Sequence, residues 1–544
     1  MLLMQKLIAF VLAIVIVINT PAQTVQRPKL VVGIVIDQMR WDYLYRYNER
    51  YADNGGFKRL LNQGFSCENT MIPYAPTVTA CGHTCIYTGS VPAINGITGN
   101  NWRDNQLNRS VYCTEDSSVQ TIGSNSGLGM QSPHNLLTTT ICDELRLATN
   151  FKGKVIGIAL KDRGGILPAG HSANAAYWYD TKTGDWITST YYMKELPEWV
   201  KTFNAQKLVD KYYKEGWNTL YPLNTYVQST ADEKSYEVKA FGSDQKGFPY
   251  NLSRFAGTNY NPITATPFGN TLTTEFAKAI INNEQLGADA ITDFLAVSFS
   301  SPDYVGHSFG PNSVEEEDTY LRLDKELGDF LNFLDAKIGK DQYLVFLSAD
   351  HGVAHVPAFA KEHNIPAGNL DMQLLFDKIN AGLKQKFHKD GLAVDIENLQ
   401  VSLNLPLIQS SSLKINEIKN WVIDYLSNQK GIAAALDMDN IATTTLTAKQ
   451  KEMLVNGYYA ARCGQIQLIL QPQWIENYVS GGTTHGVWNP YDAHIPLLWY
   501  GWGIRPGKTN REIYMTDIAP TIAALLHIQM PSGSVGNVIQ EIFK

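Results

Sequence analysis

The chain has 544 residues, a formal net charge of −7, and an ordinary globular balance of 44% hydrophobic and 18% charged residues. This composition excludes an intrinsically disordered chain, and the lack of a basic stripe in the sequence argues against a nucleic-acid-binding protein. A chain of this length can bury a large core, so we expect one large α/β domain with insertions.

The N-terminus predicts export. Lys6 precedes an apolar run at residues 7–18, and small residues up to Ala22 follow it. A basic start, an apolar stretch of about a dozen residues and a small-residue exit are typical of a signal peptide, which we place at residues 1–22. The alternative is an uncleaved membrane anchor, but a membrane span needs roughly 20 apolar residues. We therefore expect a periplasmic or secreted protein without stable membrane insertion.

Six cysteines are spread along the chain and permit disulfide bonds in an exported protein. Many pairings are open to six cysteines, so the sequence does not assign them. A core of this size folds without covalent cross-links, and disulfides are therefore permitted but not required. The six are Cys67, Cys81, Cys85, Cys113, Cys142 and Cys463.

Apolar runs rich in β-branched residues predict the strands. They lie at residues 30–36, 155–160, 294–299, 343–347 and 495–500. Continuous apolar runs are typical of strands that are buried on both faces of a parallel sheet. Helical stretches at 134–148, 272–283, 314–334 and 518–526 lie between or after them. This alternation predicts a doubly wound, mostly parallel three-layer α/β/α sandwich, whose ligand sites lie beyond the carboxyl ends of the strands.

Two segments interrupt this pattern. Residues 170–265 are rich in Tyr, Trp, Asn and Gly and have weak periodicity, so we interpret them as an inserted cap. Residues 360–480 contain several helical stretches and a polar segment, and we interpret them as a second insertion. Residues 23–544 are otherwise expected to form one domain.

The nucleophile candidate is Thr79, which lies where residues 75–83 enter a predicted helix. A helix N-terminus stabilises anions, so an alkoxide or a phosphate would be favoured there. The alternative is that Thr79 only caps the helix, and taken alone this is the better interpretation. The candidate metal ligands elsewhere in the chain favour the nucleophile.

Those candidate ligands follow three of the predicted strands. Asp37 ends the first strand, and Asp303 and His307 follow the strand at 294–299. A spacing of four residues places Asp303 and His307 on one face of a helical turn, so both point at one site.

The other candidate ligands lie in loops. Asp350 and His351 follow the strand at 343–347 and converge only in a loop, which Gly352 permits. His485 lies in a glycine-flanked loop at 481–486. A lone aspartate at a strand end is usually a cap or a turn residue, but several such residues together predict a metal site. Mixed carboxylate and imidazole ligands favour zinc, with manganese or iron as weaker alternatives.

As an ordered set, these motifs resemble the alkaline phosphatase superfamily. The set comprises Pro-Thr-x-Thr at 76–79, the strand-terminal Asp37, Asp-x-x-x-His at 303–307, Asp-His-Gly at 350–352 and Thr-His-Gly at 484–486. Residues 515–526 also resemble the closing helix of that superfamily. Within it, the chain is most similar to the branch of nucleotide pyrophosphatase/phosphodiesterases and phosphate-irrepressible alkaline phosphatases.

The resemblance implies two zinc ions per chain and an alkaline-phosphatase-like fold. It assigns Asp303, His307 and His485 to one ion. It assigns Asp37, Asp350, His351 and the Thr79 oxygen to the other. It further implies that Thr79 attacks phosphorus and is transiently phosphorylated, which splits one hard displacement into two easier ones.

Three further residues favour phosphate monoesters over diesters. If residues 161–163 are extended, Lys161 and Arg163 point to the same side, and Asn100 adds an amide donor. A monoester dianion calls for such donors, and with two zinc ions the site charge would be about +3 before Thr79 ionises. In the phosphate-irrepressible monoesterases the matching Asn, Lys and Arg bind the phosphoryl oxygens, whereas the diesterase relatives match only the Asn. The alternative is that Lys161 and Arg163 form a solvated surface pair.

The sequence therefore predicts an alkaline phosphatase that hydrolyses small-molecule phosphate monoesters with broad leaving-group tolerance, and we expect a monomer. The runner-up is a phosphodiesterase or nucleotide pyrophosphatase, and a third alternative is a catalytically silent phosphate- or metal-binding protein. No magnesium site is carried over, and a sulfatase is disfavoured because the Cys-x-Pro-x-Arg signal is absent. Other histidines are interpreted as structural, namely His83, His355, His363 and His494.

Overall fold

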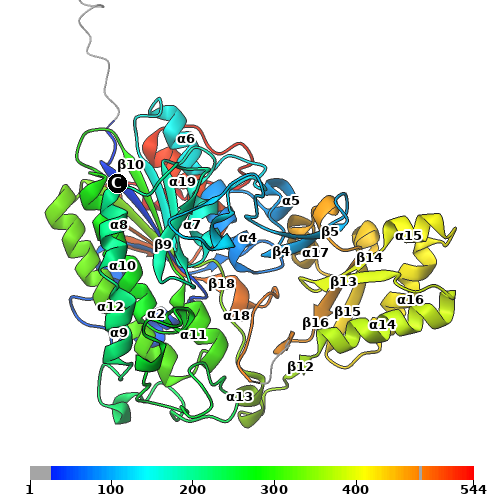
Figure 1. Cartoon of the computed structure of the whole chain (residues 1–544). Helices are drawn as coiled ribbons and strands as arrows, with labels where there is room; N and C mark the ends of the chain where they lie inside the picture. Colours follow the sequence, from blue (N-terminus) through cyan, green and yellow to red (C-terminus); the bar gives the residue numbers. More distant parts are fainter. Residues whose placement is uncertain (1–25, 477–480) are drawn as a thin grey trace, which may run out of the picture.

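The computed structural model of the chain describes residues 26–476 and 481–544. The predicted signal peptide at residues 1–22 lies outside the described residues. Figure 1 shows a large main body, built on a central sheet, and a smaller lobe that projects from one side of it. No helix in the described part of the chain has the length and apolar character of a membrane span.

A ten-stranded sheet forms the centre of the main body, in the order β20-β2-β19-β11-β1-β10-β7-β8-β9-β6. The strands β11, β1, β10, β7 and β8 run parallel, and β19 and β9 flank them in the antiparallel direction. The bounds are β1 Leu30–Ile36, β2 Phe65–Cys67, β6 Thr121–Ile122, β7 Val155–Ala159, β8 Ala175–Asp180, β9 Asp185–Ser189, β10 Asp293–Phe299, β11 Tyr343–Ser348, β19 Leu497–Gly501 and β20 Gly507–Thr509.

The register of the central strands sets the position of the site. Ile36 at the end of β1 pairs with Phe299 of β10, and Val35 pairs with Ser348 of β11. The three strands therefore reach their carboxyl ends at the same level. Residues that follow them emerge side by side at one edge of the sheet, where doubly wound sheets bind ligands.

Helices cover both faces of this sheet, as the alternating pattern predicts (Figure 1). One face carries α10 and α12, which pack on each other, with α3 against α12. The other face carries α4, α6, α7 and α19, which contact one another. The bounds are α3 Gly56–Gln63, α4 Thr79–Thr88, α6 Ile141–Ala148, α7 Asp162–Ala169, α10 Phe268–Asn283, α11 Ser301–Phe309, α12 Val314–Leu334 and α19 Ile518–Leu526. The three-layer α/β/α prediction is confirmed.

The lobe consists of a four-stranded antiparallel sheet, in the order β13-β14-β16-β15, with helices α14, α15 and α16. It has its own buried apolar cluster, which includes Ile379, Val401 and Val422. Its bounds are α14 Met372–Phe387, β13 Ala393–Glu397, β14 Gln400–Leu403, α15 Leu405–Ser410, α16 Ile415–Ser427, β15 Ile432–Asp437 and β16 Ile466–Leu470. These elements lie within the second predicted insertion, whereas the first, 170–265, contributes β8 and β9 to the central sheet.

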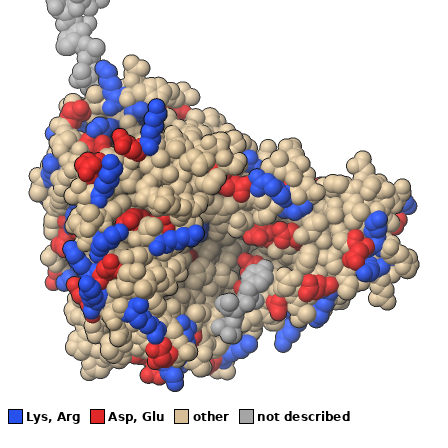
Figure 2. Space-filling model, viewed as in Figure 1, with Lys and Arg blue, Asp and Glu red and all other residues tan. Residues whose placement is uncertain are grey.

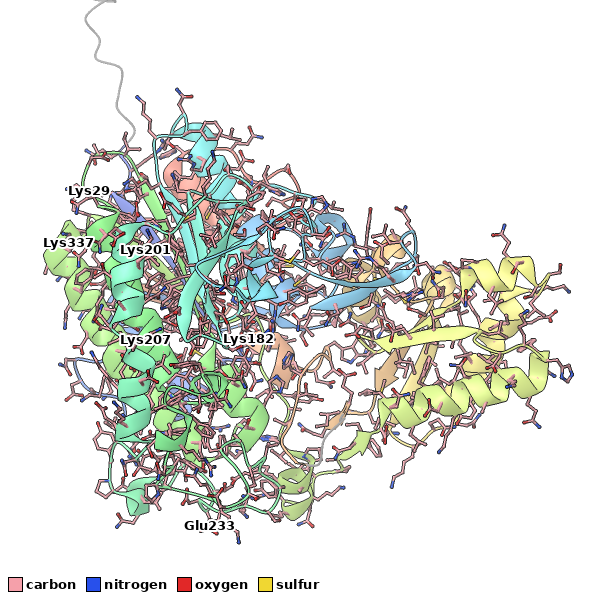
Figure 3. All side chains as sticks on the ribbon, in the orientation of Figure 1. Lys29, Lys182, Lys201, Lys207, Glu233 and Lys337 are labelled. Carbon is pink, nitrogen blue, oxygen red and sulfur yellow. The ribbon has the colours of Figure 1, made fainter. Side chains whose placement is uncertain are left out.

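Figure 2 shows a hollow between the main body and the lobe. Lys182, in the turn after β8, lies on the side of the body that faces the lobe, whereas Lys29 and Lys337 lie on the opposite side (Figure 3).

Shorter elements in the described residues are α2 Tyr43–Arg46, α5 Pro92–Asn95, α8 Glu198–Ala205, α9 Leu208–Glu215, α13 Pro357–Glu362, α17 Ala448–Gly457, α18 Pro490–Ala493, β3 Thr70–Met71, β4 Asn101–Asp104, β5 Arg109–Tyr112, β12 Gly368–Leu370, β17 Trp474–Glu476, β18 His494–Ile495 and β21 Ile513–Tyr514.

Two predicted elements differ from the structure. The run at 495–500 is not one parallel strand, because Pro496 divides it into β18 and β19, and β19 runs antiparallel to β11. Proline has no N–H to donate to a continuing ladder. The helix predicted at 134–148 begins only at Ile141, because Thr140 and Asp143 form a capping box that starts α6 there. All six cysteines are buried and none forms a disulfide.

Candidate active site

Three buried carboxylates meet at the carboxyl edge of the sheet. Asp37 follows β1, Asp350 follows β11, and Asp303 lies in the first turn of α11, which follows β10. Their residues are at most 3% exposed. Burying three carboxylates together is unfavourable unless cations or hydrogen bonds compensate their charge.

Three imidazoles surround these carboxylates, and Nδ1 of each ring hydrogen-bonds a backbone carbonyl. A backbone carbonyl can only accept a hydrogen bond, so a ring nitrogen that binds one must carry the proton. Each ring therefore presents its Nε2 to the carboxylates, which is how histidine ligands are usually oriented toward a metal. The Nδ1 contacts are His307 to Thr483 O at 2.8 Å, His351 to Gly352 O at 3.0 Å and His485 to Thr77 O at 2.7 Å.

These side chains form two groups that could each hold a metal ion. Asp37, Asp350 and His351 form one group, and Asp303, His351 and His485 form the other, with the ligand atoms of each group within 4.8 Å of one another. His351 is thus shared, and the rings of His351 and His485 stack with their centroids 3.5 Å apart. His307 lies outside both groups, although its Nε2 is 3.2 Å from Asp303 Oδ1.

The donor atoms in these groups fit a transition metal. Asp37 Oδ1, Asp350 Oδ2 and His351 Nε2 are buried and have no hydrogen-bond partner among the described residues. Buried polar atoms are rarely left unpaired, and orphaned ones point to an absent ion or water. A mixed set of carboxylates and imidazoles is the chemistry that zinc prefers.

The buried charges shift one another's protonation. Burial raises the pKa of Asp37, and neighbouring carboxylates raise it further. Burial also opposes ionisation of Asp303, but His307 and Lys161 outweigh it and hold the pKa of that carboxyl well below its usual range. Burial lowers the pKa of the His351 ring to about 3, so this ring is neutral at neutral pH, as a metal ligand must be.

Thr79 is the first residue of α4 and is 1% exposed. The N-cap of this helix is Val78, and no side chain caps it. The alternative that Thr79 serves as the cap is therefore wrong. Its hydroxyl lies 3.5 Å from Lys161 Nζ, next to the ligand groups, at the helix N-terminus where anions are stabilised.

Lys161 lies inside the site rather than on the surface. Its ammonium is 2.7 Å from Asp37 Oδ2 and also contacts Asp303 Oδ2, so it bridges the two ligand groups. The Lys161 residue is 5% exposed, and its Nζ lies 5.0 Å from the ring centroid of Tyr304. A solvated surface position is thereby excluded for Lys161.

Asn100 contacts the first turn of the helix that begins with Thr79, and Arg163 lies in α7, two residues after Lys161. Residues 161–163 are not extended as expected, because α7 begins at Asp162. Arg163 Nη1 donates to Tyr112 Oη at 3.1 Å, while its Nε is buried without a partner, and the guanidinium forms no ion pair within the described ranges. Asn100 Oδ1 accepts from the Ala80 amide at 2.9 Å, which leaves its NH₂ group free to donate elsewhere.

Sequence reasoning missed Gln38, which connects the two ligand groups. Its backbone N–H donates to Asp350 Oδ1 at 3.1 Å, and its side-chain amide donates to Asp303 Oδ1 at 2.7 Å. Gln38 has a φ of 68°, an uncommon conformation for a residue other than glycine. Nothing in the sequence pattern indicates this, because a glutamine after a strand-terminal aspartate is unremarkable in itself.

His83 also lies beside the site without joining either ligand group. It hydrogen-bonds Thr79 O at 2.9 Å and Ser298 Oγ at 2.8 Å, and its Nδ1 is 3.2 Å from Asp350 Oδ2. The remaining histidines that were interpreted as structural bond elsewhere, His355 to Asn312, His363 to Phe359 O and His494 to Glu68 O.

Comparison with known proteins identifies the family of the chain. Residues 31–492 match the family described as type I phosphodiesterase / nucleotide pyrophosphatase. The chain belongs to this family. The resemblance to the alkaline phosphatase superfamily that the motifs indicated is confirmed.

Three curated relatives match this chain over nearly their whole length. Alkaline phosphatase PhoV of Synechococcus elongatus is 56% identical over 522 residues, which cover 96% of this chain and 94% of the relative. A Myroides odoratus protein named calcium-transporting ATPase is 55% identical, with 96% and 95% covered. Alkaline phosphatase PafA of Elizabethkingia meningoseptica is 50% identical, with 95% of each covered. A crystal structure of PafA has a TM-score of 0.94, 49% identity and coverage of 96% and 100%.

Proposed function

We propose that this family member hydrolyses phosphate monoesters with broad leaving-group tolerance through a covalent phospho-Thr79 intermediate, releasing inorganic phosphate and an alcohol. The observation that carries the proposal is the convergence of unpartnered carboxylate and imidazole atoms beside the buried Thr79 hydroxyl. The names of PhoV and PafA, both alkaline phosphatases, support it.

We propose two Zn²⁺ per chain as the cofactors of this site. Three ligands, Asp303, His307 and His485, would hold one ion, and Asp37, Asp350, His351 and the Thr79 oxygen would hold the other. The three His Nδ1–H groups that are bonded to backbone carbonyls support this arrangement, because they present Nε2 to the site. When bound, paired metals supply positive charge for the entering and leaving oxygens and lower the pKa of a coordinated hydroxyl.

The chain's own groups carry the covalent steps. The Thr79 hydroxyl gives up its proton as its oxygen forms a bond to phosphorus. The bond from phosphorus to the ester oxygen breaks, and the departing alkoxide takes up a proton to become the alcohol. Water then attacks phospho-Thr79, which releases inorganic phosphate and restores the hydroxyl. The α4 N-terminus favours the phosphoryl group on Thr79 because its first amide N–H groups have no partners within the helix.

We propose that Asn100, Lys161 and Arg163 bind the phosphoryl oxygens and give the preference for monoesters. The Arg163 guanidinium supports this assignment, because it carries a charge without a partner carboxylate in the described part of the chain and uses one donor of five. Lys161 supports it through its 3.5 Å distance to the Thr79 hydroxyl. A monoester dianion gains more from these cations than a diester monoanion does.

The alternative is hydrolysis of phosphodiesters or nucleotide pyrophosphates, and the description of the matched family favours it. Rates on an aryl phosphate monoester and on its methyl diester, measured with zinc-loaded enzyme, distinguish the two. We expect a clear preference for the monoester. A preference for the diester would overturn the proposal, and no turnover of either substrate would favour a silent binding protein.

We also propose that the protein is a monomer exported to the periplasm or secreted, with residues 1–22 as its signal peptide. Residues 23–544 would form one domain with insertions at about 170–265 and 360–480, acting on small-molecule phosphate esters and binding no nucleic acid beyond nucleotide substrates. N-terminal sequencing of the mature protein tests the export proposal, and an intact residue 1 would contradict it.

A further inference from the structure

The geometry points to Tyr112 as a positioning residue for Arg163, an inference that rests on the proposed monoesterase function. Arg163 would bind substrate directly, and its guanidinium needs to be oriented for this. Within the described residues, the one hydrogen bond of its guanidinium goes from Nη1 to Tyr112 Oη, at 3.1 Å. This hydrogen bond helps to orient the guanidinium, so the group that fixes the Tyr112 hydroxyl also bears on the position of Arg163.

The Tyr112 hydroxyl is itself fixed by Asp162. It donates to Asp162 Oδ1 at 2.5 Å, so its lone pair is turned toward Arg163 and accepts from Nη1. Asp162 Oδ1 also accepts from the backbone N–H of Arg163. Burial and the adjacent Asp162 raise the pKa of the Tyr112 phenol, so this hydroxyl stays protonated and remains a donor.

The backbone of Tyr112 is tied to the other phosphate-binding group. Tyr112 ends β5 and pairs with Asn101 of β4, the residue after Asn100. The Cys113 amide, directly after Tyr112, donates to Asn100 O at 2.9 Å. The β4–β5 hairpin, which lies between the main body and the lobe in Figure 1, therefore carries both Asn100 and the residue that orients Arg163.

The same hairpin reaches the nucleophile through Asn100. Its side-chain oxygen accepts from the Ala80 amide, in the first turn of the helix that begins with Thr79. One continuous series of hydrogen bonds thus joins the nucleophile helix, Asn100, the hairpin, Tyr112 and Arg163. These hydrogen bonds set the distance between Asn100 and Arg163 before substrate binds. Stabilising the charge of a transition state requires groups that are preorganised in this way.

The test is Tyr112→Phe, which removes the hydroxyl and keeps the ring. We expect kcat/KM for an aryl phosphate monoester to fall about tenfold, the size expected for one hydrogen bond to a charged group. Inhibition by inorganic phosphate should weaken by a similar factor. The methyl diester should lose less than about twofold. In an Arg163→Ala background, Tyr112→Phe should cause no further loss on the monoester, because the residue acts through Arg163.

Tyr343→Phe provides the matched control. The Tyr343 hydroxyl also accepts from an arginine, Arg59 at 3.4 Å, and donates to an aspartate, Asp335 at 2.7 Å. It lies at the start of β11, at the opposite end of the sheet from the site. This variant should retain wild-type kinetics. A second variant, Asp162→Ala, releases the Tyr112 hydroxyl by a different change and should show the same non-additivity with Arg163→Ala.

Failure of the inference and failure of the proposed function give different results. If Arg163→Ala lowers monoester hydrolysis while Tyr112→Phe and Asp162→Ala leave it unchanged, the inference is overturned and the proposed function stands. Equal losses on monoester and diester, or a full additional loss in the Arg163→Ala background, also overturn it. If Arg163→Ala itself has no effect on the monoester, the proposed role of Arg163 fails first.

Discussion

Gly82 of α4 lies directly against Asp350. A Cβ atom added at Gly82 would fall 2.3 Å from the carbonyl oxygen of Asp350 and 2.5 Å from its Cβ atom. The helix that begins with Thr79 and the loop that carries Asp350 and His351 therefore touch through their backbones. Glycine is the residue that permits so close an approach, and the distance from Thr79 to the candidate ligands depends on it.

Gly82→Ala should consequently damage activity more than its small size suggests. The added methyl group forces α4 away from the Asp350 loop, so we expect kcat/KM to fall at least about tenfold and the free energy of unfolding to fall by about 1–3 kcal/mol. Gly127→Ala is the matched control, because nothing lies within 4 Å of a Cβ there. Kinetics and urea unfolding of both variants check this, and wild-type behaviour of Gly82→Ala would show that the contact is not restrictive.

Removal of the nucleophile should separate metal binding from turnover. Thr79→Ala is expected to keep its metal, because the carboxylates and imidazoles remain, and to lose at least about a thousandfold in kcat. Thr79→Ser keeps the hydroxyl and should retain substantial activity. Acid-quenched mass spectrometry should detect a phosphoryl group on wild-type residue 79 during turnover. Its absence, with full activity in Thr79→Ala, would refute covalent catalysis.

The two cationic residues should set substrate preference. Lys161→Ala and Arg163→Ala are each expected to lower kcat/KM for monoesters by about 10–100-fold and to affect diesters less, because the diester has one less negative charge to stabilise. Lys201→Ala, whose side chain is 47% exposed and far from the site, serves as the control. Equal losses on both substrates would contradict the assigned phosphate-binding role.

Much of the site could be predicted from the sequence because its parts follow buried strands. Asp37, Asp303 and Asp350 each come directly or shortly after an apolar run, and level strand ends bring them together. Gln38 could not be predicted, since its contacts arise from a backbone φ of 68° that no local pattern reveals. The sharing of His351 between two ligand groups likewise depends on how separate loops pack.

The fold shows the same division between local and long-range information. The sequence predicts the helix at 314–334 with the bounds of α12, because helical periodicity is a local signal, and in the structure the Ser313 side chain caps this helix. The antiparallel direction of β19 could not be read from its apolar run, because a buried strand looks the same in either direction. The sequence gives no sign that a helix begins at Asp162, because no side chain caps the N-terminus of α7. An extended path was therefore expected for residues 161–163.

Glu326, a partly buried glutamate away from the site, should make stability depend on pH. Burial raises the pKa of Glu326 from 4.5 to about 8, and its Oε2 has no hydrogen-bond partner in the described structure. Because its pKa is higher in the folded state than in the unfolded state, protonated Glu326 contributes to stability. This contribution is fully present below pH 4.5 and is lost as the pH rises through about 8. Glu326→Gln should therefore gain stability relative to wild type between pH 5 and pH 9, by a few kcal/mol at about 1.4 kcal/mol per pKa unit. Urea unfolding at both pH values checks this, with the exposed Glu195→Gln as control, and a difference that does not change with pH would contradict it.

The metal content of active, purified enzyme is the most direct test of the account. The two groups of carboxylate and imidazole ligands predict about two transition-metal ions per chain, zinc above all. They also predict loss of monoester hydrolysis on chelation and its return when zinc is added. Full activity in protein without stoichiometric metal would contradict the two-metal site and the mechanism built on it.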